Sequence, residues 1–181
     1  MSGHNKFSQI KHQKASEDGK RSKLFSMLGR QIAIQSRLAG GDVNNPSLRT
    51  LLEKARKLNM PKDTIDRGVA RGTGGNEATL EEVVFETFGS GGVAIIIQGI
   101  TDSKNRTSQE IKHILSKNEL ALGTPGSAIW AFSTSRNEEG DIVYTPNSVM
   151  EISTEDKTKL ESLIITLTDH DDIKNIATNS K

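Results

Sequence analysis

The charged residues of this chain are divided unequally between its two ends. Residues 1–75 carry 15 basic and 6 acidic side chains, a net charge of +9, whereas residues 76–181 carry 9 basic and 17 acidic side chains, a net charge of −8. The net charge of the whole chain is only +1. A chain polarised in this way is expected to form two units with different electrostatic roles, and the basic unit favours a polyanion as its partner.

The hydrophobic periodicity changes where the charge changes sign. Residues 72–76 (GTGGN) form a flexible break, with helical patterns before it and strand patterns after it. The sequence therefore predicts a basic three-helix domain over residues 1–75, with a basic arm, and an acidic α+β domain over 76–181. Hydrophobic residues make up 33% of the chain and aromatic residues 4%, which favours two modest cores over one thick core.

Three helices are expected in the basic domain. Residues 1–15 have no clear period and are interpreted as an arm that docks through Phe7 and Ile10. The first helix is predicted over residues 16–39, with Ser16 as its N-cap and a glycine pair as its end. The next two helices are predicted at 46–58, where Asn45 caps and Pro46 takes the first position, and at 61–72, which Pro61 opens and Gly72 closes.

The acidic domain is expected to mix strands and helices. Val83 and Phe85 alternate with polar residues, and residues 93–100 (VAIIIQGI) form a more buried strand after a glycine turn. Further elements are a helix at 107–118 with a Thr107–Glu110 capping box, strands at 128–132 and 142–144, a helix after the cap Ser153 and a last strand at 172–177. This order predicts an α+β sandwich domain with a mainly antiparallel sheet and helices on one face.

The basic domain carries the strongest functional signal. Six acids cannot pair with fifteen cations, so most cations are expected to bind phosphates, each contact releasing counterions. An open alternative is that the basic half pairs with the acidic half, within one chain or between two. Aromatic residues are few in this half, so a stacking platform for single strands is not expected. The predicted nucleic-acid-binding residues are Lys6, Lys11, His12, Lys14, Lys20, Arg21, Lys23, Arg30, Arg37, Arg49, Arg56, Lys62, Arg67 and Arg71. Among these, Lys23, Arg30 and Arg37 recur every seven residues and predict one cationic stripe.

Several function classes find no support in the residues. The chain has no cysteine, and its longest aliphatic run, residues 93–97, is far shorter than a membrane span. We expect a cytoplasmic protein with no membrane partner, no cofactor, no metal site and no small-molecule substrate. His4 and His12 lack acidic ligands nearby, residues 169–172 (DHDD) are interpreted as a polar turn, and no nucleophile motif is present, so no catalytic residue is predicted. Asp102 with Arg106 is compatible with an active site or with helix capping.

The N-terminal residues resemble the YebC/PmpR family, which includes the mitochondrial translational activator of cytochrome c oxidase subunit I. Gly3-His4-Asn5-Lys6-Phe7, Ile10-Lys11-His12 and Asn59-Met60-Pro61-Lys62-Asp63 carry the resemblance, which continues through Asn105-Arg106-Thr107 and Gly123-Thr124. Longer family members insert a third α+β domain, and the resemblance implies that it is missing here, with the deletion between residues 133 and 141.

The resemblance implies a basic three-helix domain, α+β domains, no catalytic residues and no cofactor. It also implies a role in translation, on the ribosome, where family members ease synthesis through difficult stretches such as consecutive prolines. Family members were long described as DNA-binding transcriptional regulators, and translation is the more recent understanding of the family. The basic surface suits either role. We predict a ribosome- and rRNA-binding translation factor, expected to be a monomer, with DNA-binding transcriptional regulation as the alternative.

Overall fold

The structure, a computed structural model, describes residues 4–74 and 79–181, and the side chains of residues 17–74 and 79–181. The helical end consists of α1 (His4–Leu38), α2 (Pro46–Lys57) and α3 (Lys62–Thr73). The other end contains β1 (Glu81–Phe88), β2 (Ala94–Thr101), α4 (Lys104–Lys117), β3 (Phe132–Arg136), β4 (Ile142–Pro146), α5 (Thr154–Asp169) and β5 (Ile173–Thr178). This mixture confirms the predicted α+β class, with all strand pairs in the named sheets antiparallel.

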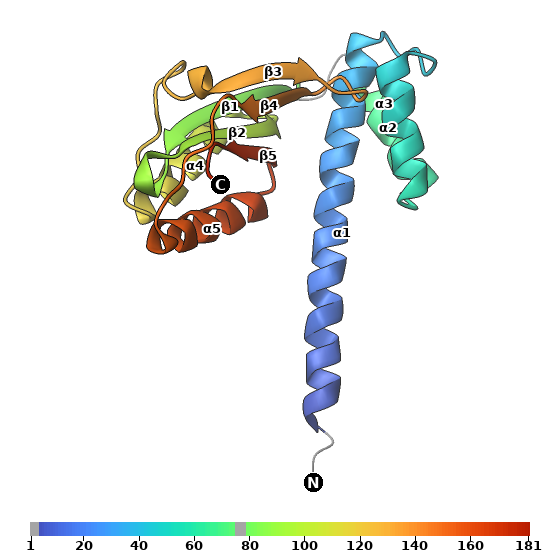
Figure 1. Cartoon of the computed structure of the whole chain (residues 1–181). Coiled ribbons are helices and arrows are strands. Elements are labelled where there is room, and N and C mark those ends of the chain that lie inside the picture. Colours follow the sequence, from blue (N-terminus) through green and yellow to red (C-terminus); the bar gives the residue numbers. More distant parts are fainter. Residues whose placement is uncertain (1–3, 75–78) are drawn as a thin grey trace.

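The first helix is longer than the sequence pattern predicts. It begins at His4, so the backbone of the expected arm is helical and Ser16 lies inside the helix instead of capping it. At 1.5 Å per residue its 35 residues span about 50 Å. Figure 1 shows that its N-terminal half extends away from the rest of the molecule. The proposed docking through Phe7 and Ile10 falls outside the described side chains.

Helix α1 is buried on two sides along its second half. Leu28 and Ile32 pack against Leu48 and Leu51 of α2 and against the start of α3. Met27, Ala33 and Ile34 instead form a cluster with Leu80 and Ile100, which belong to the sheet-containing end. The apolar half of the predicted helix therefore consists of two adjacent faces, one packed against α2 and α3 and the other against the sheet-containing end. Both ends of the molecule pack on α1. Leu38, which the pattern places on the same half, is 71% exposed.

The caps of the second helix confirm the sequence prediction. The Asn45 side chain accepts hydrogen bonds from the backbone N–H groups of Ser47 and Leu48, and Pro46 occupies the first turn. The third helix begins at Lys62 after Pro61 and runs through Gly72 to Thr73. The glycine pair Gly40-Gly41 ends α1, because both residues adopt positive φ angles of 60° and 84°.

The sheet-containing end has three layers. The strand order of the main sheet is β1-β2-β5, and its inner face packs Ile95 and Ile97 against α4 and α5. The opposite face, through Ala94 and Ile96, is covered by Phe132 of the β3–β4 hairpin and its neighbours. Figure 1 shows the two helices on one face of the main sheet and β3–β4 on the other. All eight residues of β2 are buried, as expected for the central strand.

Two elements of this end differ from the sequence prediction. Residues 128–132 were expected to form a strand, but Ile129–Ala131 form a 3-10 turn and the strand begins at Phe132. The expected capping box is also wrong. Helix α4 begins one turn earlier, after Ser103, so Thr107 lies within it and turns its hydroxyl toward Asp172 and Thr101. A long-range contact, absent from the local pattern, determines the role of Thr107.

Candidate nucleic-acid interface

The helical end presents cations that have no acidic partner among the described residues. They lie on all three helices, their side chains are exposed, and within residues 17–74 and 79–181 no carboxylate approaches them as an ion pair. They are Lys20, Arg21, Arg37, Arg56, Lys57 and Arg67. Lys57 was not among the predicted binding residues, although its position in the last turn of a predicted helix was a usable signal. We call these six residues the open cations.

Two further cations of the predicted set have only weak partners. Arg49 lies 3.3 Å from Glu53, and Lys62 lies 4.0 Å from Asp66. Both pairs join residues one helical turn apart, and all four side chains are at least half exposed. Pairs of this kind contribute about 0.3–0.5 kcal/mol and are screened by salt, so a phosphate can replace the carboxylate at little cost.

The predicted stripe of three cations does not form an open surface. Arg30 donates from Nη1 to Asp172 Oδ1 at 2.5 Å and to the Ile100 carbonyl at 2.8 Å. Lys23 donates from Nζ to the carbonyl oxygens of Thr168 and His170. Burial lowers the pKa of Lys23, and the charge of Asp171, followed by that of Asp169, offsets part of that shift. Two members of the stripe therefore hold the helical end to the sheet-containing end, and Arg37 alone of the three remains exposed.

Asp172 is the centre of this junction. Its side chain is 1% exposed and accepts from Arg30, from Arg106 Nη2 at 2.9 Å and from Thr107 Oγ1 at 2.6 Å. Burial by itself would raise the pKa of Asp172, but the hydrogen bonds from Thr107 and Arg30 and the two guanidinium charges hold it below its ordinary value. The sequence interpretation of residues 169–172 as a polar turn holds for the backbone and misses this contact. Arg106 also lies 3.1 Å from Asp102 and 3.3 Å from Glu110, so its guanidinium joins three carboxylates.

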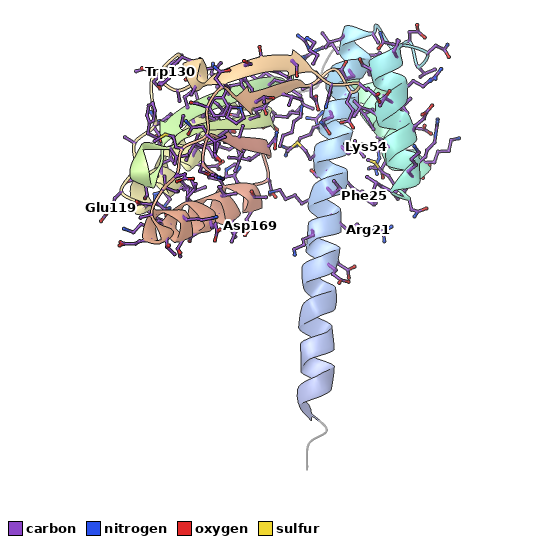
Figure 2. All side chains as sticks on the ribbon, in the orientation of Figure 1. Arg21, Phe25, Lys54, Glu119, Trp130 and Asp169 are labelled. Carbon is purple, nitrogen blue, oxygen red and sulfur yellow. The ribbon has the colours of Figure 1, made fainter. Side chains whose placement is uncertain are left out.

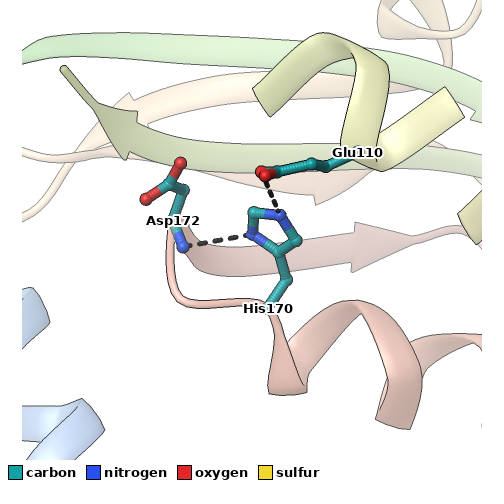
Figure 3. A group of neighbouring side chains, drawn as sticks. All are labelled: Glu110, His170 and Asp172. Atoms are coloured by element: carbon teal, nitrogen blue, oxygen red, sulfur yellow. Dashed lines mark hydrogen bonds and ion pairs between the residues drawn. The ribbon is translucent and has the colours of Figure 1, made fainter. Parts of the chain in front are cut away.

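The polar cluster beside Asp172 does not fit a metal ion. Glu110, His170 and Asp172 place a possible ligand atom each within 4.8 Å of one another. However, the Asp172 N–H donates to His170 Nδ1 at 3.1 Å, and His170 Nε2 lies 3.0 Å from Glu110 (Figure 3). Both ring nitrogens therefore have partners, and the oxygens of Asp172 already accept from two cations and a hydroxyl. An ion would have to displace these donors, so we assign the cluster a structural role.

The turn between β3 and β4 provides a second contact between the two ends. Lys54 of α2 lies 2.7 Å from Glu139, and the Gln31 side chain donates to Asp141 at 2.8 Å. Lys174 of β5 approaches Asp141 at 2.5 Å from the other side. Residues 137–141 join the two strands as a short turn. The alternative that part of the basic half pairs with the acidic half within the chain is therefore realised at the junction by the ion pairs of Arg30 and Lys54. Lys23 adds hydrogen bonds to carbonyl oxygens of the same half.

Five predicted binding residues remain, and for four of them the structure describes only the backbone. Lys6, Lys11, His12 and Lys14 belong to the helical backbone of α1, but their side chains lie outside the described residues. Arg71 is half-buried and lines a groove between α1 and α3 together with Arg30 and Arg67.

The described part of the chain contains no helix long and apolar enough to cross a membrane.

These features define an α+β protein whose helical end presents positive charge to solvent while a buried carboxylate secures it to the sheet-containing end. Residues 5–75 match the family model of the TACO1/YebC protein N-terminal domain, and residues 80–137 match that of the TACO1/YebC second and third domain. The chain belongs to the TACO1/YebC family.

Its relatives include proteins named as probable transcriptional regulatory proteins. One from Fervidobacterium nodosum is 52% identical over 73% of this chain and 53% of its own length, and one from Francisella tularensis subsp. novicida is 45% identical over 86% and 63%. The chain thus spans between half and two thirds of these relatives. A solved structure of a conserved hypothetical protein from Aquifex aeolicus is similar with a TM-score of 0.82 and 26% identity, covering 90% of each chain.

Proposed function

We propose that this chain is a non-enzymatic nucleic-acid-binding factor that acts in the cytoplasm on the ribosome, as a monomer, with ribosomal RNA as its partner. The observation that carries the proposal is the set of open cations, which have no carboxylate partners in the described part of the chain. Each phosphate that such a cation neutralises releases a counterion, which favours binding at physiological salt. The acidic end would face away from the RNA and orient the factor.

The long first helix supports the same proposal. Its N-terminal half extends beyond the packed part of the molecule and includes Lys6, Lys11 and Lys14 in its sequence. A helix that lacks packing is marginally stable in water, so a partner that covers this half would stabilise it. A factor of this shape would hold the ribosome's substrates in a reactive geometry during difficult synthesis, for example across consecutive prolines, without contributing a nucleophile.

The second candidate function is DNA-binding transcriptional regulation, which the names of the relatives favour. Direct reading of base edges uses Asn, Gln and Arg side chains on a helix that enters the major groove. Neither α2 nor α3 contains Asn or Gln, and the exposed face of α3 carries Asp63 and Asp66, which phosphates would repel. The short helices therefore suit phosphate binding better than sequence reading.

A sedimentation experiment separates the two candidates. Ribosomes from lysate are fractionated on a gradient with the native chain, with a variant that replaces Lys20, Arg21, Arg56 and Arg67 by Gln, and with a control variant that replaces the exposed Lys104, Lys112, Lys117 and Lys157 by Gln. Both variants lose four positive charges. We expect the native chain and the control to migrate with ribosomes and the first variant to stay near the top. A native chain that is absent from ribosomal fractions yet selects one promoter fragment in competitor DNA would support the second candidate instead.

A further inference from the structure

A groove between α1 and α3 combines small residues with arginines. Its volume is about 680 Å³, which is within the range of sites that hold small ligands. Gly68 lies at the helix contact, where an added Cβ would be only 3.3 Å from the Gly29 carbonyl oxygen and 3.2 Å from Ile32. Because no side chain stands at Gly29 or Gly68, the two helices meet closely and leave room above their contact.

Three arginines contribute to the walls of the groove, and no Asp or Glu is among the described residues that line it. Arg30 is already bound to Asp172, so the residue we consider for an anion is the exposed Arg67. Arg67 donates to the Asp63 carbonyl oxygen and to Thr64 Oγ1, both in its own helix. A guanidinium group has five N–H donors, so Arg67 retains donors for an anion. This arrangement favours a phosphate group.

One end of the groove carries a planar stacking surface. Phe25 lines the groove, and the Arg21 guanidinium lies over its ring, 5.2 Å from the ring centroid. Figure 2 shows both residues on the part of α1 next to the ends of α2 and α3. The contact with the ring positions the guanidinium, which is itself planar, while Arg21 remains exposed. An arginine plane held in this way can stack on an unpaired base as an aromatic ring does.

We propose that this groove binds one nucleotide of an unpaired RNA strand, with the phosphate on Arg67 between the helices and the base on the outer face of Arg21. The proposal rests on the proposed function, because it specifies which part of an RNA partner the helical end recognises. A base-paired strand keeps its bases inside the duplex and offers only phosphates. The groove therefore prefers single-stranded over double-stranded RNA, whereas the open cations outside it do not discriminate.

The test compares two RNA probes of the same length and composition, one unstructured strand with 2-aminopurine and one fully paired duplex. Arg67→Gln is expected to weaken binding of the single strand about tenfold, because a charge-assisted hydrogen bond is lost, and to weaken duplex binding much less. Arg56→Gln, which removes an exposed cation of α2 outside the groove, is the matched control and should weaken both probes by the same small factor. Arg21→Lys keeps the charge but removes the plane, so the quenching of 2-aminopurine should fall while duplex affinity stays.

If the native chain binds both probes and Arg67→Gln behaves like Arg56→Gln on each of them, the groove proposal is overturned and the proposed function stands. Unchanged quenching in Arg21→Lys would likewise overturn the stacking surface. If the native chain binds neither probe at low salt, the proposed function itself fails. Thermal unfolding of each variant should match the native chain, because all three substituted side chains are exposed.

Discussion

Asp172→Asn is expected to loosen the junction between the two ends of the molecule and to lower the free energy of unfolding by about 3 kcal/mol. The substitution leaves two guanidinium groups without their shared carboxylate, and the Asp172 side chain is 1% exposed. This loss is at the lower end of the range for breaking a buried ion pair, because the Arg106 side chain is 45% exposed. Chemical denaturation measures the loss, and small-angle scattering measures the wider separation of the two ends.

The neighbouring substitution Asp171→Asn is the control. Asp171 is exposed and acts on Lys23 only through its charge. We therefore expect Asp171→Asn to lower the free energy of unfolding by less than about 0.5 kcal/mol. An Asp172→Asn variant as stable and as compact as the Asp171→Asn variant would show that the junction does not depend on this carboxylate.

The same carboxylate sets the pH dependence of the junction. Its pKa in the folded protein is lower than its ordinary value, so it contributes stability above the ordinary carboxyl pKa, and this contribution disappears as the pH falls through the lower folded value. We therefore expect the difference in stability between the native chain and Asp172→Asn to be constant near neutral pH and to shrink in acid. Denaturation curves at a series of pH values test this, and a difference that grows in acid would contradict the assigned charge of Asp172.

Gly72→Ala is expected to separate α3 from α1 and to destabilise the helical end by about 3 kcal/mol, at the upper end of overpacking effects. A Cβ at this position would lie 2.4 Å from the Ala33 carbonyl oxygen and 2.8 Å from the Arg37 backbone nitrogen. Both atoms belong to the backbone of α1, which cannot move aside as a flexible side chain would. Loss of helical signal at lower denaturant concentration would report the effect.

Gly19→Ala is also a glycine-to-alanine substitution, but it is expected to change stability in the opposite direction. Gly19 lies inside α1 with no atom within 4 Å of an added Cβ, so the substitution should stabilise the helix by up to about 1 kcal/mol. If both variants shifted stability in the same direction, the close approach of α1 and α3 would not explain the glycine at position 72.

The sequence was most informative where local signals decide the structure. Asn45 followed by Pro46 predicted the start of α2, and the buried run after the glycine turn predicted the central strand β2. Gly72 shows the limit of such signals. Its sequence context predicts the end of a helix, whereas α3 runs past it and the glycine permits close contact with Ala33 of α1.

The residues at the junction could not be recognised from sequence spacing. Lys23 and Arg30 have the spacing of a phosphate-binding stripe, but their partners are near Asp172, more than a hundred residues later. Ser16 has the sequence signal of a cap, because serine before two acidic residues is a common helix start and the preceding residues lack an apolar period, yet it lies inside α1. A helix that continues without an apolar face has no hydrophobic pattern to reveal it.

The open cations are expected to bind a polyanion outside the molecule, and the salt dependence of binding to purified ribosomal RNA tests this most directly. Plots of log affinity against log salt are compared for the native chain, the variant lacking Lys20, Arg21, Arg56 and Arg67, and the control variant lacking Lys104, Lys112, Lys117 and Lys157. Each lost phosphate contact on a single strand flattens the slope by about 0.7, so the first variant should be shallower by about 3 and the control should match the native chain. Equal slopes for all three proteins would contradict the claim.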